Sequence, residues 1–175
     1  SSAHGFFYNA DMLAQAGVDR WPETWDGFLA MIESLKKTFG DEPGFAPISL
    51  GAKSKWPING YFHAWVLSYN GEEWYESLKE DRGARWTDPG VIRAIEAIAT
   101  LRDIGAFNAD ANGTDLQQMR AMYFNRRSAI HREGNWLVGR MESEAPQEIL
   151  GLLVGIGGRW VEPAELGGIG RTPHR

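Results

Sequence analysis

The sequence predicts an α/β protein with a single compact domain in which helices outnumber strands. Its 175 residues are enough for one domain with a substantial core. Short apolar runs bounded by turn residues alternate with longer stretches whose apolar residues recur every three or four positions, as in buried strands and amphipathic helices. These patterns fill residues 1–150, whereas residues 151–175 hold 7 of the 21 glycines without periodicity. We therefore expect a folded lobe over 1–150 and a Gly-rich irregular tail over 151–175.

The first half of the chain predicts two strands and three helices. The aromatic run 5–9 predicts a strand, and the helix after it should end at Gly17, which tolerates a left-handed C-cap. Thr24 is the expected N-cap of the second helix, and a brief buried strand follows over 46–50. A third helix should begin after the turn at 53–56. The expected core residues of the second and third helices are Trp25, Phe28, Ile32, Leu35 and Phe39, then Phe62, Trp65, Val66 and Tyr69.

The second half predicts three further helices and one strand. The pair 88–89, Asp-Pro, is typical of a helix start, and this helix should close at Gly105. Another helix opens at Thr114 or Asp115, and residues 128–132 predict a strand. A last helix follows the turn 134–136, with Asn135 as its expected N-cap. The expected apolar faces are Val91, Ile95 and Ile98 in the first of these helices, and Leu116, Met119 and Tyr123 in the second.

Composition excludes several classes of function. The net charge of −5 and the absence of Lys/Arg runs argue against a nucleic-acid partner. Without cysteine, the chain cannot form disulfides or use a thiol nucleophile. No apolar stretch approaches the roughly 20 residues that span a bilayer, and no secretion-signal pattern opens the chain. We expect a water-soluble chain that carries no export signal of its own.

Three local patterns resemble catalytic, metal or cofactor motifs, and each lacks a required residue. Residues 108–113 resemble the first half of a calcium loop, but Met119 stands where a bidentate Glu is needed. The glycines near 155 lack dinucleotide spacing, and the four histidines lack helical metal-ligand spacing. Carboxylates such as Glu133 are expected at the solvated surface, and no nucleophile motif is present. We therefore expect no metal, no cofactor and no catalytic residues.

Two tryptophans lie at the edges of predicted elements, outside the core stripes. Trp56 stands in the turn before the third helix, and Trp136 follows Gly134 and Asn135 directly after a strand. Sugars present C–H faces that stack on flat rings, while free N–H groups at a helix start bind hydroxyl groups. By composition alone, Trp136 is equally compatible with a ligand platform and with a core residue. We expect both indoles to be partly exposed on one concave surface.

The order and spacing of several stretches resemble those of the extracellular solute-binding proteins of ABC sugar importers, the group that includes maltose-binding protein. The resemblance covers roughly residues 1–145. The stretches are FYNADML at 7–13 with AGV at 16–18, PETWDGF at 22–28, KSKWP at 53–57, WTDP at 86–89, FNAD at 107–110 and AIHREGNW at 129–136.

This resemblance implies a periplasmic-binding-protein-like (type II) fold, in which two α/β lobes close on a sugar. By the same resemblance, the chain is expected to correspond to most of the second lobe. The resemblance implies that Trp136 stacks on a mono- or oligosaccharide and that Trp56 and Tyr61 line the cleft, with Asn135 beside them. It also implies delivery to ABC permease subunits, a periplasmic or extracellular location, and lipoprotein anchoring in full-length members.

Two readings of the chain remain open. It is either a partial chain of a carbohydrate-binding importer component, or a stand-alone interaction or structural module derived from one lobe. An isolated lobe would expose an apolar face, so self-association is a further expectation.

Overall fold

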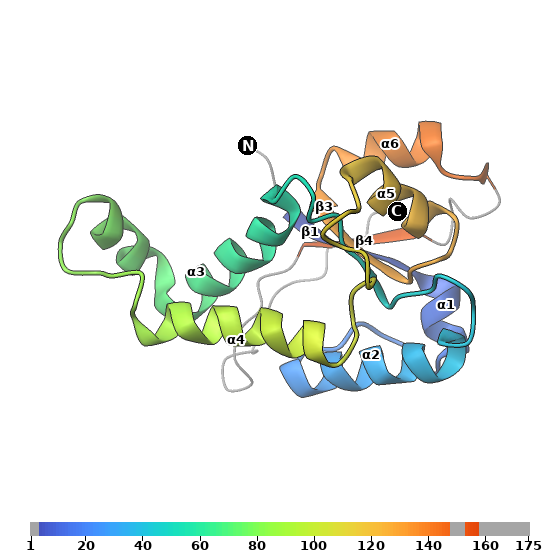
Figure 1. Cartoon of the computed structure of the whole chain (residues 1–175), viewed down its shortest axis with the longest axis horizontal. Helices are drawn as coiled ribbons and strands as arrows, with labels where there is room; N and C mark the ends of the chain where they lie inside the picture. The colour runs from blue at the N-terminus through green and yellow to red at the C-terminus, as the bar shows by residue number, and fades with distance from the viewer. Residues whose placement is uncertain (1–3, 148–152, 158–175) are drawn as a thin grey trace.

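The computed structural model describes residues 4–147 and 153–157, which form a small mixed sheet covered by helices on both faces (Figure 1). The strands are β1 (His4–Asn9), β2 (Ile48–Ser49), β3 (Ile130–Gly134) and β4 (Leu153–Gly157), and their order in the sheet is β2-β3-β1-β4. Strand β1 runs antiparallel to β3 and β4, while β2 runs parallel to β3. The helices are α1 (Ala10–Gln15), α2 (Trp25–Phe39), α3 (Trp56–Lys79), α4 (Pro89–Asp103), α5 (Leu116–Phe124) and α6 (Leu137–Glu144).

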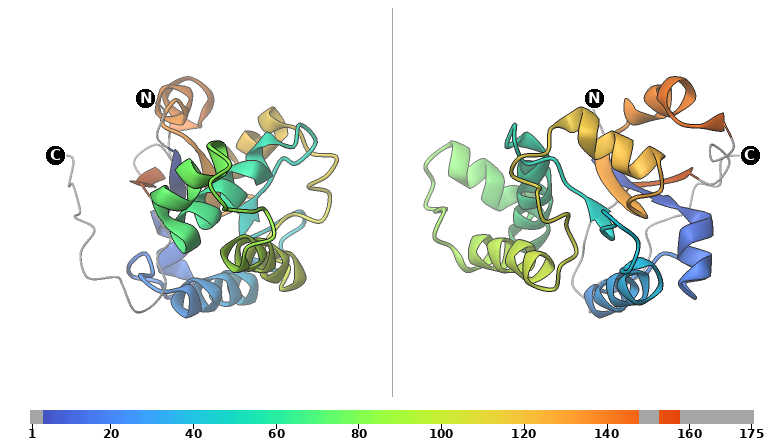
Figure 2. Two further views of the ribbon diagram at one scale, coloured as in Figure 1. Left: turned by 90° about the vertical axis from the view of Figure 1, so that its left-hand side faces the viewer. Right: turned by 45° about the vertical axis from the view of Figure 1, so that its right-hand side comes forward.

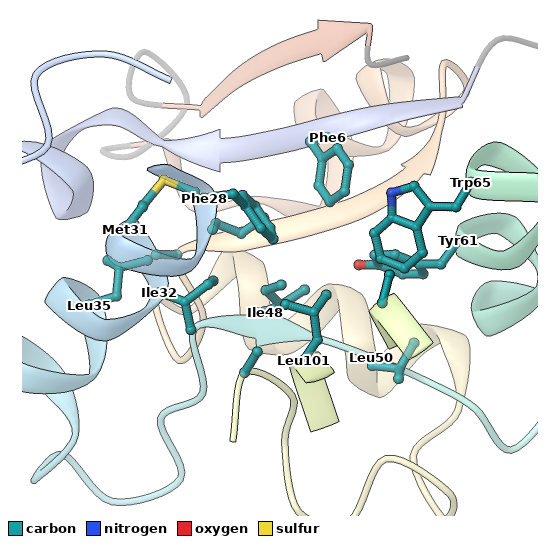
Figure 3. Packing of buried hydrophobic residues seen from close by; sticks show 14 of the residues in the cluster. Phe6, Phe28, Met31, Ile32, Leu35, Ile48, Leu50, Tyr61, Trp65 and Leu101 are labelled. Carbon is teal, nitrogen blue, oxygen red and sulfur yellow. The ribbon is translucent and has the colours of Figure 1, made fainter. Parts of the chain in front are cut away.

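Two adjacent phenylalanines of β1 point to opposite faces of the sheet and divide the core. Phe6 belongs to the larger cluster, to which α2, α3 and α4 contribute, whereas Phe7 packs with residues of α5 and α6. Figure 2 shows α5 and α6 on one side of the sheet, and α2 and α4 on the other. Figure 3 shows how Phe6 lies among side chains from α2, α3, β2 and α4. The predicted α/β architecture is therefore confirmed.

Local signals placed most helices correctly. Thr24 caps α2, because its Oγ1 accepts a hydrogen bond from the Gly27 amide at 3.0 Å. Asp115, with Gln118, forms a capping box at the start of α5. Gly17 and Gly105 have φ values of 75° and 70° beyond the ends of α1 and α4, as expected of C-terminal glycines. Of the expected α2 core residues, only Trp25 is not fully buried.

The face of α4 was predicted only in part. Val91 is buried as expected and Ile98 is partly buried against the core, whereas Ile95 is 50% exposed. The other buried residues of α4 are Gly90, Ala94, Ala97 and Leu101. Small alanines let α4 pack against α3, and the larger Ile95 is left outside this contact.

The tail boundary at 150 was also wrong. Residues 153–157 form β4, which pairs with β1 from Asn9↔Leu153 to Gly5↔Gly157. The glycines made a short run of residues that favour strands difficult to recognise. Hydrogen bonding to β1 orders this segment, although its local propensity alone does not indicate a strand. The rest of the predicted tail, 151–152 and 158–175, lies outside the described residues. Within the described part of the chain, no helix is both long and apolar enough to cross a bilayer.

Candidate functional site

Trp56 and Trp136 come together where α3 begins and β3 ends. Trp56 is the first residue of α3 and Trp136 lies in the turn between β3 and α6. The two side chains are 37% and 40% exposed, and their ring centroids are 6.3 Å apart with planes inclined at 59°. Both indoles are partly exposed, as predicted, while their place on one concave surface stays a prediction. We call these two residues the aromatic pair.

A surface hollow of about 510 Å³ lies beside Trp56. It is lined by Ser54, Lys55, Trp56, Ile58, Asn59 and Phe62. Indole and phenyl rings next to amide, hydroxyl and ammonium groups provide both flat apolar faces and hydrogen-bonding groups. This combination suits a ligand that has apolar faces and many hydroxyl groups.

A buried carboxylate holds the Trp136 indole in place. Trp136 Nε1 donates a hydrogen bond of 2.6 Å to Glu133 Oε1, and the Arg120 guanidinium donates to both carboxylate oxygens. The indole folds back over Gly134, where a Cβ atom would overlap the ring. The Trp136 ring is therefore fixed in orientation although it is partly exposed.

Glu133 is fully buried, so its expected surface position was wrong. Burial alone would raise its pKa, but hydrogen bonds from His131, Arg120 and Trp136 outweigh this effect and lower the pKa to about 2. The carboxylate is therefore ionised at neutral pH. The sequence did not predict this burial, because a polar residue on a strand lacks the apolar character that marks a buried position. Its partner Arg120 also lies on a different element, α5.

Ser49, His131 and Glu133 form a chain of hydrogen bonds that resembles a catalytic triad. Ser49 Oγ is 2.9 Å from His131 Nδ1, and His131 Nε2 is 2.9 Å from Glu133 Oε2. All three residues are buried, so a substrate cannot reach the Ser49 hydroxyl. Burial also lowers the pKa of His131, which favours the neutral ring. The chain of bonds is structural and orients Glu133 beneath Trp136.

Two other predicted site residues lie differently from expectation. Tyr61 is 1% exposed and packs in the core, so it does not line the ligand surface. Asn135 is exposed beside Trp136, but it is not the N-cap of α6. Trp136 is the N-cap, because its backbone already has helical dihedral angles (φ −63°, ψ −16°).

The pattern resembling a calcium loop is a hydrogen-bonded turn. The Asn108 side chain accepts from the Leu50 amide and donates to Asp110 and Thr114, so its amide is used internally. Within the described residues, no group of three or more His, Cys, Asp or Glu side chains is placed to hold a metal ion.

The sequence profile of the bacterial extracellular solute-binding proteins matches residues 1–142. The chain belongs to this family. An uncharacterized ABC transporter extracellular-binding protein of Pyrococcus horikoshii is 26% identical over 79% of this chain and 31% of its own length. The multiple sugar-binding protein of Streptococcus mutans is 21% identical over 86% of this chain and 36% of its own. The chain thus spans about a third of the length of these curated relatives.

The solved structure of a chitin oligosaccharide binding protein superimposes with a TM-score of 0.80 at 23% identity, over 91% of this chain and 38% of that one. The helix-rich arrangement around a small sheet is therefore the type II periplasmic-binding-protein-like fold expected from the sequence. Solute-binding proteins of this family are not enzymes, and their extracellular or periplasmic location applies to this member.

Proposed function

We propose that this solute-binding lobe binds a mono- or oligosaccharide on the aromatic pair, as the carbohydrate-capturing component of an ABC importer. The observation that carries the proposal is the orientation of Trp136: a partly exposed indole held by a buried carboxylate, next to a second exposed indole. A ring that is fixed before binding loses little freedom when a sugar stacks on it. The names of the Streptococcus relative and of the chitin-oligosaccharide neighbour support a sugar as the ligand.

The wider setting of this function is part of the same proposal. In a longer protein, the sugar would be enclosed between this lobe and a further lobe and delivered to ABC permease subunits, with a lipoprotein anchor holding the protein at the membrane. Alone, the present lobe offers only one side of such a site. We therefore propose weak binding by the isolated chain, in the millimolar range (about −4 kcal/mol), and self-association through the exposed apolar rings.

Trp136→Ala is expected to weaken sugar binding by roughly five- to thirtyfold, because losing one stacking face costs about 1–2 kcal/mol. Ligand-observed NMR titrations with a panel of mono- and oligosaccharides measure the dissociation constants. Tyr75→Ala is the matched control, since Tyr75 is an exposed aromatic residue of α3 beyond the helix break at Gly71.

Equal affinity in the Trp136 and Tyr75 variants would show that the sugar does not stack on Trp136. Sedimentation at the same protein concentration reports self-association. A self-associating chain that binds no sugar in the panel would support the interaction-module reading instead.

A further inference from the structure

A second hollow, of about 340 Å³, adjoins the aromatic pair. His4 connects the two, because it lines this hollow and its ring meets Trp136 edge-on at 5.1 Å between centroids. The remaining lining residues are Gly60, His63, Ala64, Leu67, Ser68 and Arg132. A ligand stacked on Trp136 would therefore have this hollow within reach of its substituents.

Arg132 is the charged group of this hollow, and it is only 7% exposed. Its guanidinium carbon lies 5.1 Å from the ring centroid of Tyr61 and 5.8 Å from that of Phe6, so aromatic faces support the cation. Gly60 lets the guanidinium approach α3 closely, because a Cβ atom there would overlap Arg132 Nη1. The side chain is thus held by its surroundings.

Within the described residues, no carboxylate or carbonyl accepts a hydrogen bond from Arg132, and no carboxylate lines the hollow. Glu133, its neighbour in sequence, lies on the opposite face of β3 and is bound by His131, Arg120 and Trp136. The charge of Arg132 acts on this hollow, since it adds to burial in lowering the pKa of His4.

A buried cation without an anionic partner is costly, and a guanidinium is shaped to bind a carboxylate through two parallel hydrogen bonds. We propose that this hollow takes the carboxylate of an acidic sugar whose ring stacks on the aromatic pair, so that the ligand class is a uronic-acid saccharide. This inference rests on the sugar-binding function proposed above. His4 and His63 supply further donors at the rim.

The test compares sugars that differ only in the acid group. The 175-residue chain is titrated with glucuronate, with its uncharged isostere glucuronamide and with glucose, then with galacturonate and galactose, and with acetate alone. The Trp136 indole signal and the Arg132 Nε signal are followed by NMR. We expect at least one uronate to bind about tenfold or more tightly than its neutral counterpart, with the difference shrinking as salt is raised.

Arg132→Met should abolish the preference for the uronate and leave neutral-sugar binding unchanged, while Arg132→Lys should keep part of it. Arg93→Met is the matched control, because Arg93 also lies over a tyrosine ring, that of Tyr69 at 4.5 Å. If Arg132→Met does not fold, the comparison of uronates with neutral sugars in the wild type and in Arg132→Lys still decides whether the hollow recognises the acid group.

Equal binding of every acid and neutral pair would overturn this inference and leave the sugar-binding proposal standing. Absence of binding to every sugar in the panel would overturn both this inference and the sugar-binding proposal. Acetate binding as tightly as the uronates would show an anion site that does not recognise a sugar, which also overturns the inference.

Discussion

Glu133→Ala is expected to destabilise the folded chain by about 3–5 kcal/mol, because the Arg120 guanidinium would remain buried without its counter-charge. The carboxylate is fully buried and accepts hydrogen bonds from Arg120, His131 and Trp136. Urea unfolding monitored by circular dichroism measures the change. Glu144→Ala is the control, since the Arg140–Glu144 pair on α6 is exposed and such pairs contribute about 0–1 kcal/mol.

The pH dependence of stability gives a second readout of Glu133. Its folded pKa of about 2 lies below its usual value of 4.5, so its stabilising contribution is complete above about pH 5 and is lost as the pH falls from 4.5 towards 2. Burial lowers the pKa of His131 below its usual value of 6.5, so the unfolded chain binds this proton more readily than the folded chain. His131 therefore begins to reduce stability at a higher pH than Glu133, as the pH falls below 6.5. Glu133→Gln should remove the loss of stability between about pH 4.5 and pH 2, because glutamine does not titrate. If both Glu133 variants were as stable as the wild type and lost stability with falling pH in the same way, the buried ion pair would be contradicted.

Tyr61→Ala is expected to cost about 3–5 kcal/mol of stability, whereas Tyr61→Phe should unfold at the same or a slightly higher urea concentration. The ring packs against Trp65 and Phe107 at centroid distances of 5.6 and 5.7 Å. Its buried hydroxyl finds no hydrogen-bond partner among the described residues, so the phenylalanine loses no bond and no longer buries an unsatisfied group.

Tyr61→Phe should also leave sugar affinity unchanged, because the hydroxyl does not reach the ligand surface. A tenfold loss of affinity in this variant, with the fold intact, would restore Tyr61 to the binding site. A destabilisation above about 1 kcal/mol would instead indicate a hydrogen bond of the hydroxyl.

The sequence predicted what is encoded locally and missed what depends on long-range burial. The Thr24 cap, the start of α5 at Thr114 or Asp115, and the edge positions of Trp56 and Trp136 follow from neighbouring residues and were correct. The burial of Tyr61 agrees with its i, i+4 spacing to the buried Trp65. Its expected place in the cleft came from the family resemblance and not from this local pattern.

The buried polar residues of β3 had no such local signal. Alternation along a strand places His131 and Glu133 on one face and Arg132 on the other. Helix α5 supplies the partner of Glu133, and the rings beneath Arg132 come from β1 and α3. Only the assembled sheet shows which of these charges is paired within the described part of the chain and which is not.

Residue-resolved NMR of the tryptophan indoles during a sugar titration shows whether the sugar binds on the aromatic pair. We expect the Nε1 signals of Trp136 and Trp56 to shift together and saturate in the millimolar range, while that of the buried Trp65 stays fixed. Saturable shifts at other residues, with Trp136 and Trp56 unaffected across the panel of neutral and acidic sugars, would contradict a sugar site on the aromatic pair.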